Sequence, residues 1–249
     1  MFNVKATTEN PERYSRFYRW LYLLPGEKFI SHSIYKPIDC TDIKESGINS
    51  SGIYSIWPVS HAEGFQVYCD MDTEGGGWTV FHRRISDENS TNYFREIWED
   101  YSLGFGELDS DFWLGNDKLT AITSQGNYTM RLDREIKGGF AFHNYMDTFK
   151  IGNEYELYRL YLTNPYKIYV PNLSGYTNYL NFSSFDSDND FLEDLNCADV
   201  YKYGWWFDGC LNFDIYFQGK DYIDVIKNTP LHQYMYKMEA KIRRKPCTN

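Results

Sequence analysis

The chain has 249 residues, of which 42% are hydrophobic and 19% aromatic, a composition that is typical of a folded globular protein. Its 25 basic and 35 acidic residues give a formal net charge of −10, which argues against nucleic acid or an anionic membrane as a partner. Because no stretch of about 18 apolar residues is present, we expect no membrane span. The length fits one large domain or two small ones.

Residues 1–37 are predicted to be an N-terminal extension or linker, with a short helix over Glu12–Leu24. The longest apolar run here, Trp20–Leu24, has five residues, whereas the hydrophobic part of a signal peptide needs roughly seven or more. Three explanations stay open: the start is truncated, export does not use a visible signal, or the chain is cytosolic.

From residue 38 onward the sequence favours β-strands. Ser51–Ile56 and Gln66–Met71 alternate between polar and apolar residues and are rich in β-forming side chains, so they predict a pair of strands. Three consecutive glycines at 75–77 predict a tight bend before a further strand over Trp78–Arg84.

The later elements mix helices and strands without the regular alternation of a doubly wound fold, and this favours an α+β fold. We expect helices over Tyr93–Tyr101 and Phe112–Ser124, the second capped by Asp109 or Ser110. Strands are expected over Tyr128–Asp133, Gly139–Tyr145, Tyr155–Leu162 and, to close the domain, Met238–Arg243. The segment between the last two strands is predicted to be rich in loops.

Residues 186–210 are the most informative stretch, because three alternating aspartates precede two cysteines there. Asp186, Asp188 and Asp190 supply hard oxygen donors on a short irregular loop, which suits Ca²⁺. The spacing is not that of an EF-hand, since Cys197 occupies the position of its final glutamate. A solvated acidic loop without a metal is the alternative interpretation.

Cysteine and asparagine usage speaks against the cytosol. Four of the five cysteines fall into two pairs of moderate spacing, and no C-x-x-C motif or neighbouring histidine predicts a zinc site. The fifth, Cys247, is either a free thiol or a link to another chain. The excess of N-x-S/T sequons favours secretion, and the candidate glycosylation sites are Asn49, Asn89, Asn127, Asn172 and Asn181.

Catalysis has little support in the sequence. None of the five histidines lies in a motif with serine, cysteine or glutamate; they are His32, His61, His82, His143 and His232. We interpret His82 as a packed strand residue and the aromatic block Trp205–Phe207 as core. The chain is therefore not expected to be an enzyme.

Several long motifs follow one another between residues 38 and 242. They are Asp39-Cys40, SGIYSI, VYCDMDTEGGGWTVFHRR, GFGELDSDFWLGNDKL and the DSDND…NCA…GWWFDGC stretch. With these motifs the chain resembles the fibrinogen C-terminal (fibrinogen-related) domains of fibrinogen, ficolins, tachylectins, tenascins and angiopoietins.

The resemblance implies an α+β fold with an antiparallel central sheet, short flanking helices and a loop-rich calcium-binding C-terminal subdomain. The domain would span residues 38–245. Its implied parts are a disulfide-linked N-terminal subdomain (38–77), a central subdomain (78–145), a loop-rich calcium and ligand subdomain (146–237) and a closing strand (238–245).

The same resemblance implies site residues. The disulfides would be Cys40–Cys69 and Cys197–Cys210. Ca²⁺ would be held by the carboxylates of Asp188 and Asp190 and by backbone carbonyls at Leu192 and Asp194. Lectin members of the family build a ligand pocket beside a cis peptide, which would fall at Gly209–Cys210; the implied ligand-binding residues are Tyr201, Gly209, Cys210, Leu211 and Tyr222.

The chain departs from the family pattern directly after Cys210. The family has a histidine and a few further residues there, whereas Leu211-Asn212-Phe213 follow at once in this chain.

The resemblance implies a secreted, calcium-stabilised, lectin-like module of innate immunity that binds glycans or acetylated groups. The alternative is a protein-binding ligand for a cell-surface receptor, in adhesion or in growth-factor-like signalling. Tyr201 favours the first function and the missing histidine the second. Cys247 is the candidate link for an oligomer.

Overall fold

The computed structural model describes residues 36–85, 94–136, 141–165, 179–207, 210 and 235–246. By its internal contacts the chain divides into two units, Met1–Lys36 and Pro37–Asn249, and the elements below belong to the second. Within the described ranges, every helix is too short or too polar to cross a membrane. The expected helix over Glu12–Leu24 and the thiol of Cys247 lie outside these ranges.

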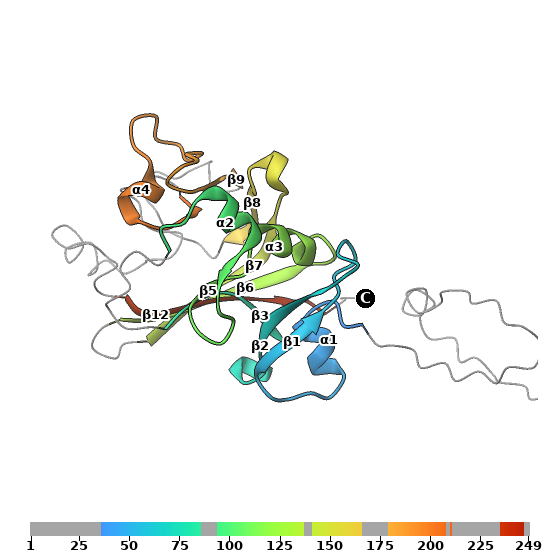
Figure 1. Ribbon diagram of the computed structural model, residues 1–249. Helices are drawn as coiled ribbons and strands as arrows, with labels where there is room; N and C mark the ends of the chain where they lie inside the picture. Colours follow the sequence, from blue (N-terminus) through green and yellow to red (C-terminus); the bar gives the residue numbers. More distant parts are fainter. Residues whose placement is uncertain are drawn as a thin grey trace, which may run out of the picture. The chain divides into compact units, whose positions relative to one another are not determined.

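One large antiparallel sheet organises this unit, with the strand order β1–β2–β3–β12–β6–β7–β8–β9 (Figure 1). The strands are β1 (Gly52–Ile56), β2 (Phe65–Asp70), β3 (Trp78–Arg84), β6 (Tyr128–Ile136), β7 (Ala141–Ile151), β8 (Leu160–Pro165), β9 (Tyr179–Leu180) and β12 (Met235–Arg244). Two short strands, β4 (Phe105–Gly106) and β5 (Phe112–Trp113), join the sheet beside β3. The C-terminal strand β12 pairs with both β3 and β6 and so holds the two halves of the sheet together.

Short helices accompany the sheet, as expected for an α+β fold. They are α1 (Cys40–Glu45), α2 (Trp98–Leu103), α3 (Asn116–Thr123) and α4 (Cys197–Tyr201), with 3₁₀ turns η2 (Thr73–Gly75) and η3 (Glu154–Glu156). The Asp39 carboxylate caps α1 by accepting the Asp42 N–H at 3.1 Å. The predicted fold class is confirmed by this sheet and its short helices.

The helix predicted over Phe112–Ser124 begins later than expected. Phe112 and Trp113 form β5 instead, and both side chains are buried. Gly115 then adopts a φ of 110°, which only glycine reaches easily, and turns the chain into α3. Apolar residues that look like the first helical turn are therefore sheet residues, because burial in the sheet outweighs helix propensity there. Similarly, the helix predicted over Tyr93–Tyr101 is the shorter α2.

The strand predicted over Tyr155–Leu162 also begins later, at Leu160. Residues 154–156 form η3, which is stabilised by reciprocal hydrogen bonds between Asn153 and Glu156. The strand β7 is continuous through residue 146, where the sequence placed a boundary between the central and the loop-rich subdomains. That subdivision stays a prediction.

Aromatic side chains make up much of the buried core. Trp113 is buried and lies within 6 Å of Phe81, Tyr101 and Phe182, counted between ring centroids. The block Trp205–Phe207 is buried as expected. Burial of a large apolar side chain contributes about 1.5–3 kcal/mol to the free energy of folding. The buried rings of residues 205–207 therefore help to hold this segment in the core.

His82 is the packed strand residue that the sequence predicts. Its ring contacts Phe94, Trp113 and Trp205, and within the described ranges neither ring nitrogen has a hydrogen-bond partner. Burial, and secondly the charge of Arg84, lower the pKa of His82 to about 3. The imidazole is therefore neutral and behaves as an aromatic core residue.

A buried lysine links β12 to β2 and β6. Lys241 Nζ lies 2.6 Å from Asp70, 2.8 Å from Asp133 and 3.0 Å from Glu239, each measured to a carboxylate oxygen. Only 3% of the Lys241 side chain is exposed. The chain thus replaces the water around a charged amine with three carboxylates from β2, β6 and β12.

Candidate calcium and ligand-binding loop

The aspartate-rich stretch forms a loop, residues 184–204, that two short paired strands carry. β10 (Phe182–Ser183) and β11 (Trp205–Trp206) pair antiparallel, and all four side chains are buried. Trp206 Nε1 donates to the Tyr158 carbonyl at 2.7 Å and so fixes β11 to the turn before β8. The ends of the loop are therefore held, although the loop itself has little regular structure.

Tyr101 on α2 fixes the C-terminal end of the loop. Its hydroxyl donates to the Phe94 carbonyl and accepts the Gly204 N–H, both at 2.7 Å. A Cβ at position 204 would come within 2.7 Å of the Tyr101 ring, so only glycine fits this approach.

Two asparagines that the sequence analysis did not single out organise the loop from inside. Asn189 Nδ2 donates to the carbonyls of Phe182 and Ser187, at 3.0 and 3.3 Å. Asn196 caps α4 through Oδ1, which accepts the Asp199 N–H at 3.0 Å, while its Nδ2 donates to the Ser184 carbonyl at 3.1 Å. The DSDND stretch at 186–190 contains a signal for the first, since short polar side chains favour local hydrogen bonds to the backbone.

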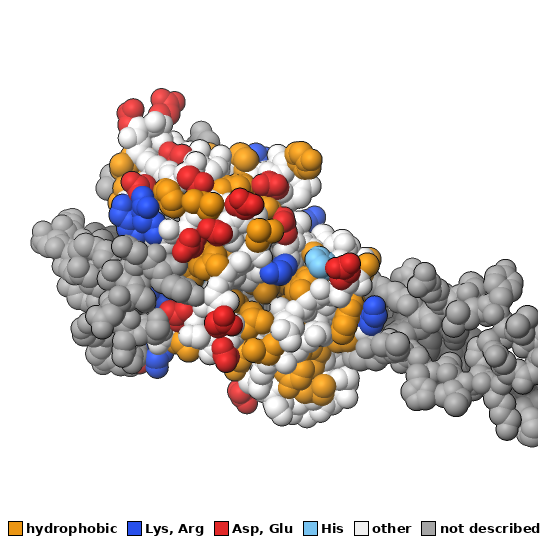
Figure 2. Space-filling model, in the orientation of Figure 1, with side chains coloured by type: hydrophobic (Ala, Val, Ile, Leu, Met, Phe, Trp, Pro, Cys, Tyr) orange, Lys and Arg blue, Asp and Glu red, His pale blue; other side chains and the backbone are white. Residues whose placement is uncertain are grey.

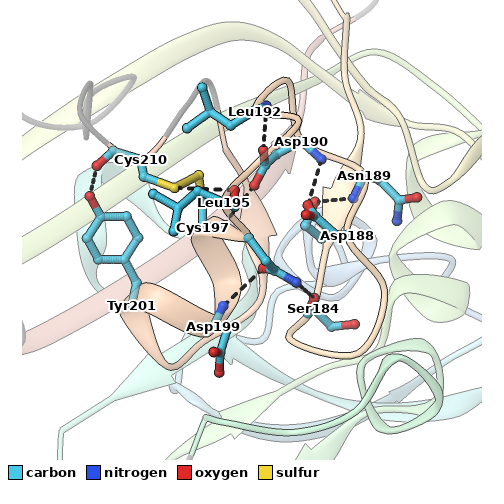
Figure 3. The surroundings of a disulfide bond; sticks show 12 residues. Ser184, Asp188, Asn189, Asp190, Leu192, Leu195, Cys197, Asp199, Tyr201 and Cys210 are labelled. Atoms are coloured by element: carbon cyan, nitrogen blue, oxygen red, sulfur yellow. Dashed lines mark hydrogen bonds between the residues drawn. A yellow bond between two sulfur atoms is a disulfide. The ribbon is translucent and has the colours of Figure 1, made fainter.

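Asp190 lies at the centre of the loop and faces its own backbone (Figure 3). One carboxylate oxygen accepts the Leu192 N–H at 2.8 Å, and the other accepts the Cys197 N–H at 2.9 Å. Asp188 is close by but more exposed, and it accepts a long bond of 3.4 Å from the Asp190 N–H. The loop thus brings the two predicted carboxylate ligands together.

These two carboxylates fit a hard divalent cation. Burial, followed by the charge of Asp190, raises the pKa of Asp188, so like charges oppose each other at this point. Neither aspartate forms an ion pair with a lysine or arginine within the described ranges. Carboxylate oxygens on a loop with accessible backbone carbonyls form the donor set that Ca²⁺ prefers. Leu192 and Asp194 belong to the same loop, and their role as carbonyl ligands stays a prediction.

The two predicted disulfides are present. Cys40–Cys69 joins α1 to β2, and Cys197–Cys210 joins the first residue of α4 to the chain beyond β11. The Asp190 carboxylate also lies close to the sulfurs of Cys197 and Cys210. Because these sulfurs are bonded to each other, they are not the thiolates that a zinc site requires.

Tyr201 lies beside the second disulfide, where the predicted ligand edge begins. Its hydroxyl donates to the Cys210 carbonyl (Figure 3). Its ring stacks on Phe207 with 5.8 Å between centroids. The structure thus brings together Tyr201 and Cys210, two of the predicted ligand-binding residues. The other three, Gly209, Leu211 and Tyr222, lie outside the described ranges, as does the expected cis bond before Cys210.

Acidic side chains dominate the surface around the loop. In Figure 2 they stand out at the tip of the loop that precedes α4 and along the face below it. The basic residues Arg95 and Lys202 share one Asp199 carboxylate oxygen, at 2.8 and 3.1 Å, whereas residues 184–204 carry six acidic side chains and one lysine. The loop therefore presents a field that attracts cations.

The predicted glycosylation sites differ in exposure. Asn49 and Asn127 are exposed, whereas Asn181 is half-buried and accepts a hydrogen bond from Arg159 at 3.1 Å. The hydroxyl-bearing residue of its sequon, Ser183, is fully buried. Asn89 and Asn172 lie outside the described ranges.

Comparison with known proteins gives a consistent result. Residues 36–238 match the family model "Fibrinogen beta and gamma chains, C-terminal globular domain". The chain is similar to Techylectin-5A of Tachypleus tridentatus, with 42% identity over 83% of this chain and 74% of the relative. Other relatives are longer, and the chain spans 43% of human fibroleukin.

Solved structures of the same kind superpose on the chain. The fibrinogen-like globe domain of human ANGPTL2 matches with a TM-score of 0.68 and 29% identity, over 84% of this chain and 100% of that one. Lamprey fibrin D-dimer, complexed with the peptide Gly-His-Arg-Pro-amide, matches with a TM-score of 0.66 and 25% identity, over 86% and 76%. The chain belongs to the fibrinogen C-terminal domain family, whose members are non-enzymatic recognition modules.

Proposed function

We propose that this chain is a secreted, calcium-stabilised recognition module of the lectin type, which binds glycans or acetylated surface groups beside the 184–204 loop. Two disulfides support the extracellular part of this proposal, because such bonds form and persist in oxidising compartments. The lectin part is supported by the likeness to Techylectin-5A.

The pairing of Asp188 with Asp190 carries the proposal. A loop that is fixed by β10, β11 and Asn196 holds two carboxylates near each other without a matching cation among the described side chains. Bound Ca²⁺ would supply the missing positive charge and would tie the exposed half of the loop to its anchored half. Asp188 and Asp190 would hold it, together with backbone carbonyls at Leu192 and Asp194.

The binding edge would be the aromatic surface at the second disulfide. The Tyr201 hydroxyl is engaged with the Cys210 carbonyl, so a ligand would meet the ring of Tyr201 and the adjacent backbone. Phe207 and Tyr203 lie against this ring and hold its orientation. A preorganised aromatic surface loses little conformational entropy on binding, which favours recognition of a small group such as an acetyl.

A second function is favoured by one specific observation. The family's histidine after the last disulfide cysteine has no counterpart before Leu211, so part of the acetyl pocket is missing from the sequence. A protein or peptide ligand, in adhesion or receptor signalling, would depend less on that pocket. The peptide bound to the related lamprey fibrin D-dimer supports this alternative.

A glycan array, probed in calcium and in EDTA, tests the proposal. Calcium-dependent binding that N-acetylated sugars compete away is the expected result. Tyr201→Ala should abolish this binding, whereas Tyr54→Phe, a change far along the chain in β1, should leave it unchanged. Absence of any glycan binding, with calcium-dependent binding to a receptor ectodomain, would reject the lectin function in favour of the second one.

A further inference from the structure

The turn that joins β7 to β8 (Figure 1) contains Tyr155, whose side chain contributes nothing to packing. The side chain of Tyr155 is 100% exposed, and the next most exposed large apolar residue in the described ranges is Val59 at 68%. No hydrogen bond of the Tyr155 hydroxyl is found within those ranges. A fully exposed phenol at the tip of a turn is accessible to an enzyme or a partner.

The backbone beneath Tyr155 is firmly held. Asn153 and Glu156 form a capping box, and the next two residues, Leu157 and Tyr158, have φ angles of 54° and 46°. Such left-handed conformations cost about 1–3 kcal/mol each in residues other than glycine, so surrounding contacts must maintain them. Tyr158 is fully buried and donates its hydroxyl to Asp117 at 2.8 Å, which anchors the turn.

Two negative charges are fixed on either side of Tyr155. Glu154 Oε1 accepts the Trp98 Nε1–H at 2.9 Å, and Glu156 Oε1 accepts the Tyr161 hydroxyl at 2.7 Å. The bond from Tyr161, followed by that from the Asn153 backbone, lowers the pKa of Glu156, which is therefore ionised. The structure thus displays an acid–tyrosine–acid triplet, with each acid on an exposed residue and the phenol between them.

We propose that Tyr155 is a site of tyrosine O-sulfation. An enzyme of the secretory pathway that transfers sulfonate would recognise an accessible phenol between carboxylates through basic groups of its own. The phenol oxygen attacks the sulfur of an activated sulfate donor, a mixed anhydride of sulfate and a nucleoside phosphate. The new O–S bond forms as the S–O bond to the donor phosphate breaks; the phosphate leaves with the electron pair, and the phenolic proton passes to a base of the transferase. The inference rests on the proposed secretion of the chain.

The other tyrosines in the described part of the chain lack one or more of these features. Tyr101 follows an aspartate but is buried, with its hydroxyl donated to the Phe94 carbonyl. Tyr161 donates its hydroxyl to Glu156. Tyr179 is 55% exposed, but its neighbours in sequence are asparagine and leucine. Tyr179 therefore serves as an exposed control without adjacent acids.

The direct test uses the purified, oxidised full chain, a purified tyrosylprotein sulfotransferase and a radiolabelled sulfate donor. We expect one sulfate per chain, located at Tyr155 by peptide mass spectrometry, complete loss of label in Tyr155→Phe and full label in Tyr179→Phe. Glu154→Gln should lower the rate while leaving the melting temperature unchanged, because the single glutamine oxygen still accepts the Trp98 Nε1–H. Absence of label, or label that persists in Tyr155→Phe, would overturn the inference.

Expression in animal cells behind an added secretion leader separates this inference from the proposed function. The peptide that contains Tyr155 should gain the mass of one SO₃ group, and alkaline phosphatase should not remove it. Secreted, fully oxidised protein with an unmodified Tyr155, or with a group that phosphatase removes, would overturn sulfation and leave the recognition function standing. Retention in the cell, with sulfation of Tyr155 by the purified enzyme, would count against secretion and support the site.

Discussion

Replacing Lys241 by methionine removes the only cation that the described side chains place against Asp70. Lys241 Nζ contacts three carboxylates at 3.0 Å or less, and its side chain is 3% exposed. Methionine fills a similar volume but leaves these charges without their partner. Removal of one member of a buried ion pair costs about 3–5 kcal/mol, so we expect the free energy of unfolding at pH 7 to fall by that amount.

The pH dependence gives this prediction a second signature. Burial raises the pKa of Asp70, but hydrogen bonds from Lys241 and Thr73 outweigh it and lower the pKa from 3.8 to about 2. Since the unfolded chain binds this proton more readily, the stabilisation is present above about pH 4 and is lost as the pH falls toward 2. The stabilisation that the lowered pKa of Asp70 provides amounts to about 2 kcal/mol. In Lys241→Met, Asp70 is protonated more readily, so the deficit relative to wild type should narrow by about this amount at low pH.

Urea unfolding followed by tryptophan fluorescence, at neutral pH and at about pH 2, measures both quantities. Lys237→Met is the matched control, because Lys237 lies on the same strand, is 44% exposed and reaches Glu135 only at 3.5 Å. An exposed pair contributes about 0–1 kcal/mol. The reasoning is refuted if Lys241→Met costs no more than Lys237→Met, or if its cost is the same at both pH values.

Three further predictions concern the core and the surface. Tyr101→Phe leaves the Gly204 N–H without its acceptor and should lower the free energy of unfolding by about 1–3 kcal/mol, measured by thermal denaturation; an unchanged value would contradict the role of Tyr101. The pKa of His82 falls from 6.5 to about 3 on folding, so the free energy of unfolding decreases as the pH falls below 6.5, by about 2 kcal/mol at about pH 5. His82→Phe should remove this decrease. The same dependence of stability on pH in wild type and His82→Phe would contradict the prediction. In secreted protein, Asn127→Gln should remove one glycan, whereas Asn181→Gln should not alter the glycan mass, because the Asn181 sequon is partly buried.

The sheet follows from the sequence because its strands carry their own signals. Alternation in Ser51–Ile56, the glycines before Trp78 and the β-rich closing segment all indicate strands, and β1, β3 and β12 occur there. The order of strands does not follow from such local signals. β12 lies between β3 and β6 through contacts between residues far apart in the chain, which no local pattern encodes.

The candidate site divides in the same way. The acidic spacing of Asp188 and Asp190 is visible in the sequence, and the loop brings both carboxylates together. Asn189 and Asn196 were not identified, because an asparagine that supports a loop resembles any polar loop residue until its partners in β10 and the loop are known. The sequence predicts too early a start for α3 for a related reason. An apolar residue such as Phe112 fits the buried face of a helix as well as that of a strand.

The most direct test of the recognition account is the melting temperature of Asp188→Asn, measured in calcium and in EDTA. Within the described ranges Asp188 accepts a long bond of 3.4 Å from the Asp190 N–H, and burial, followed by the charge of Asp190, raises its pKa, so loss of its charge should cost little without metal. Asp190→Asn should lower the melting temperature in both conditions, because Asp190 also accepts the N–H groups of Leu192 and Cys197. We expect calcium to raise the melting temperature of the wild type and to leave that of Asp188→Asn unchanged. An equal calcium-induced rise in both proteins would contradict the calcium site.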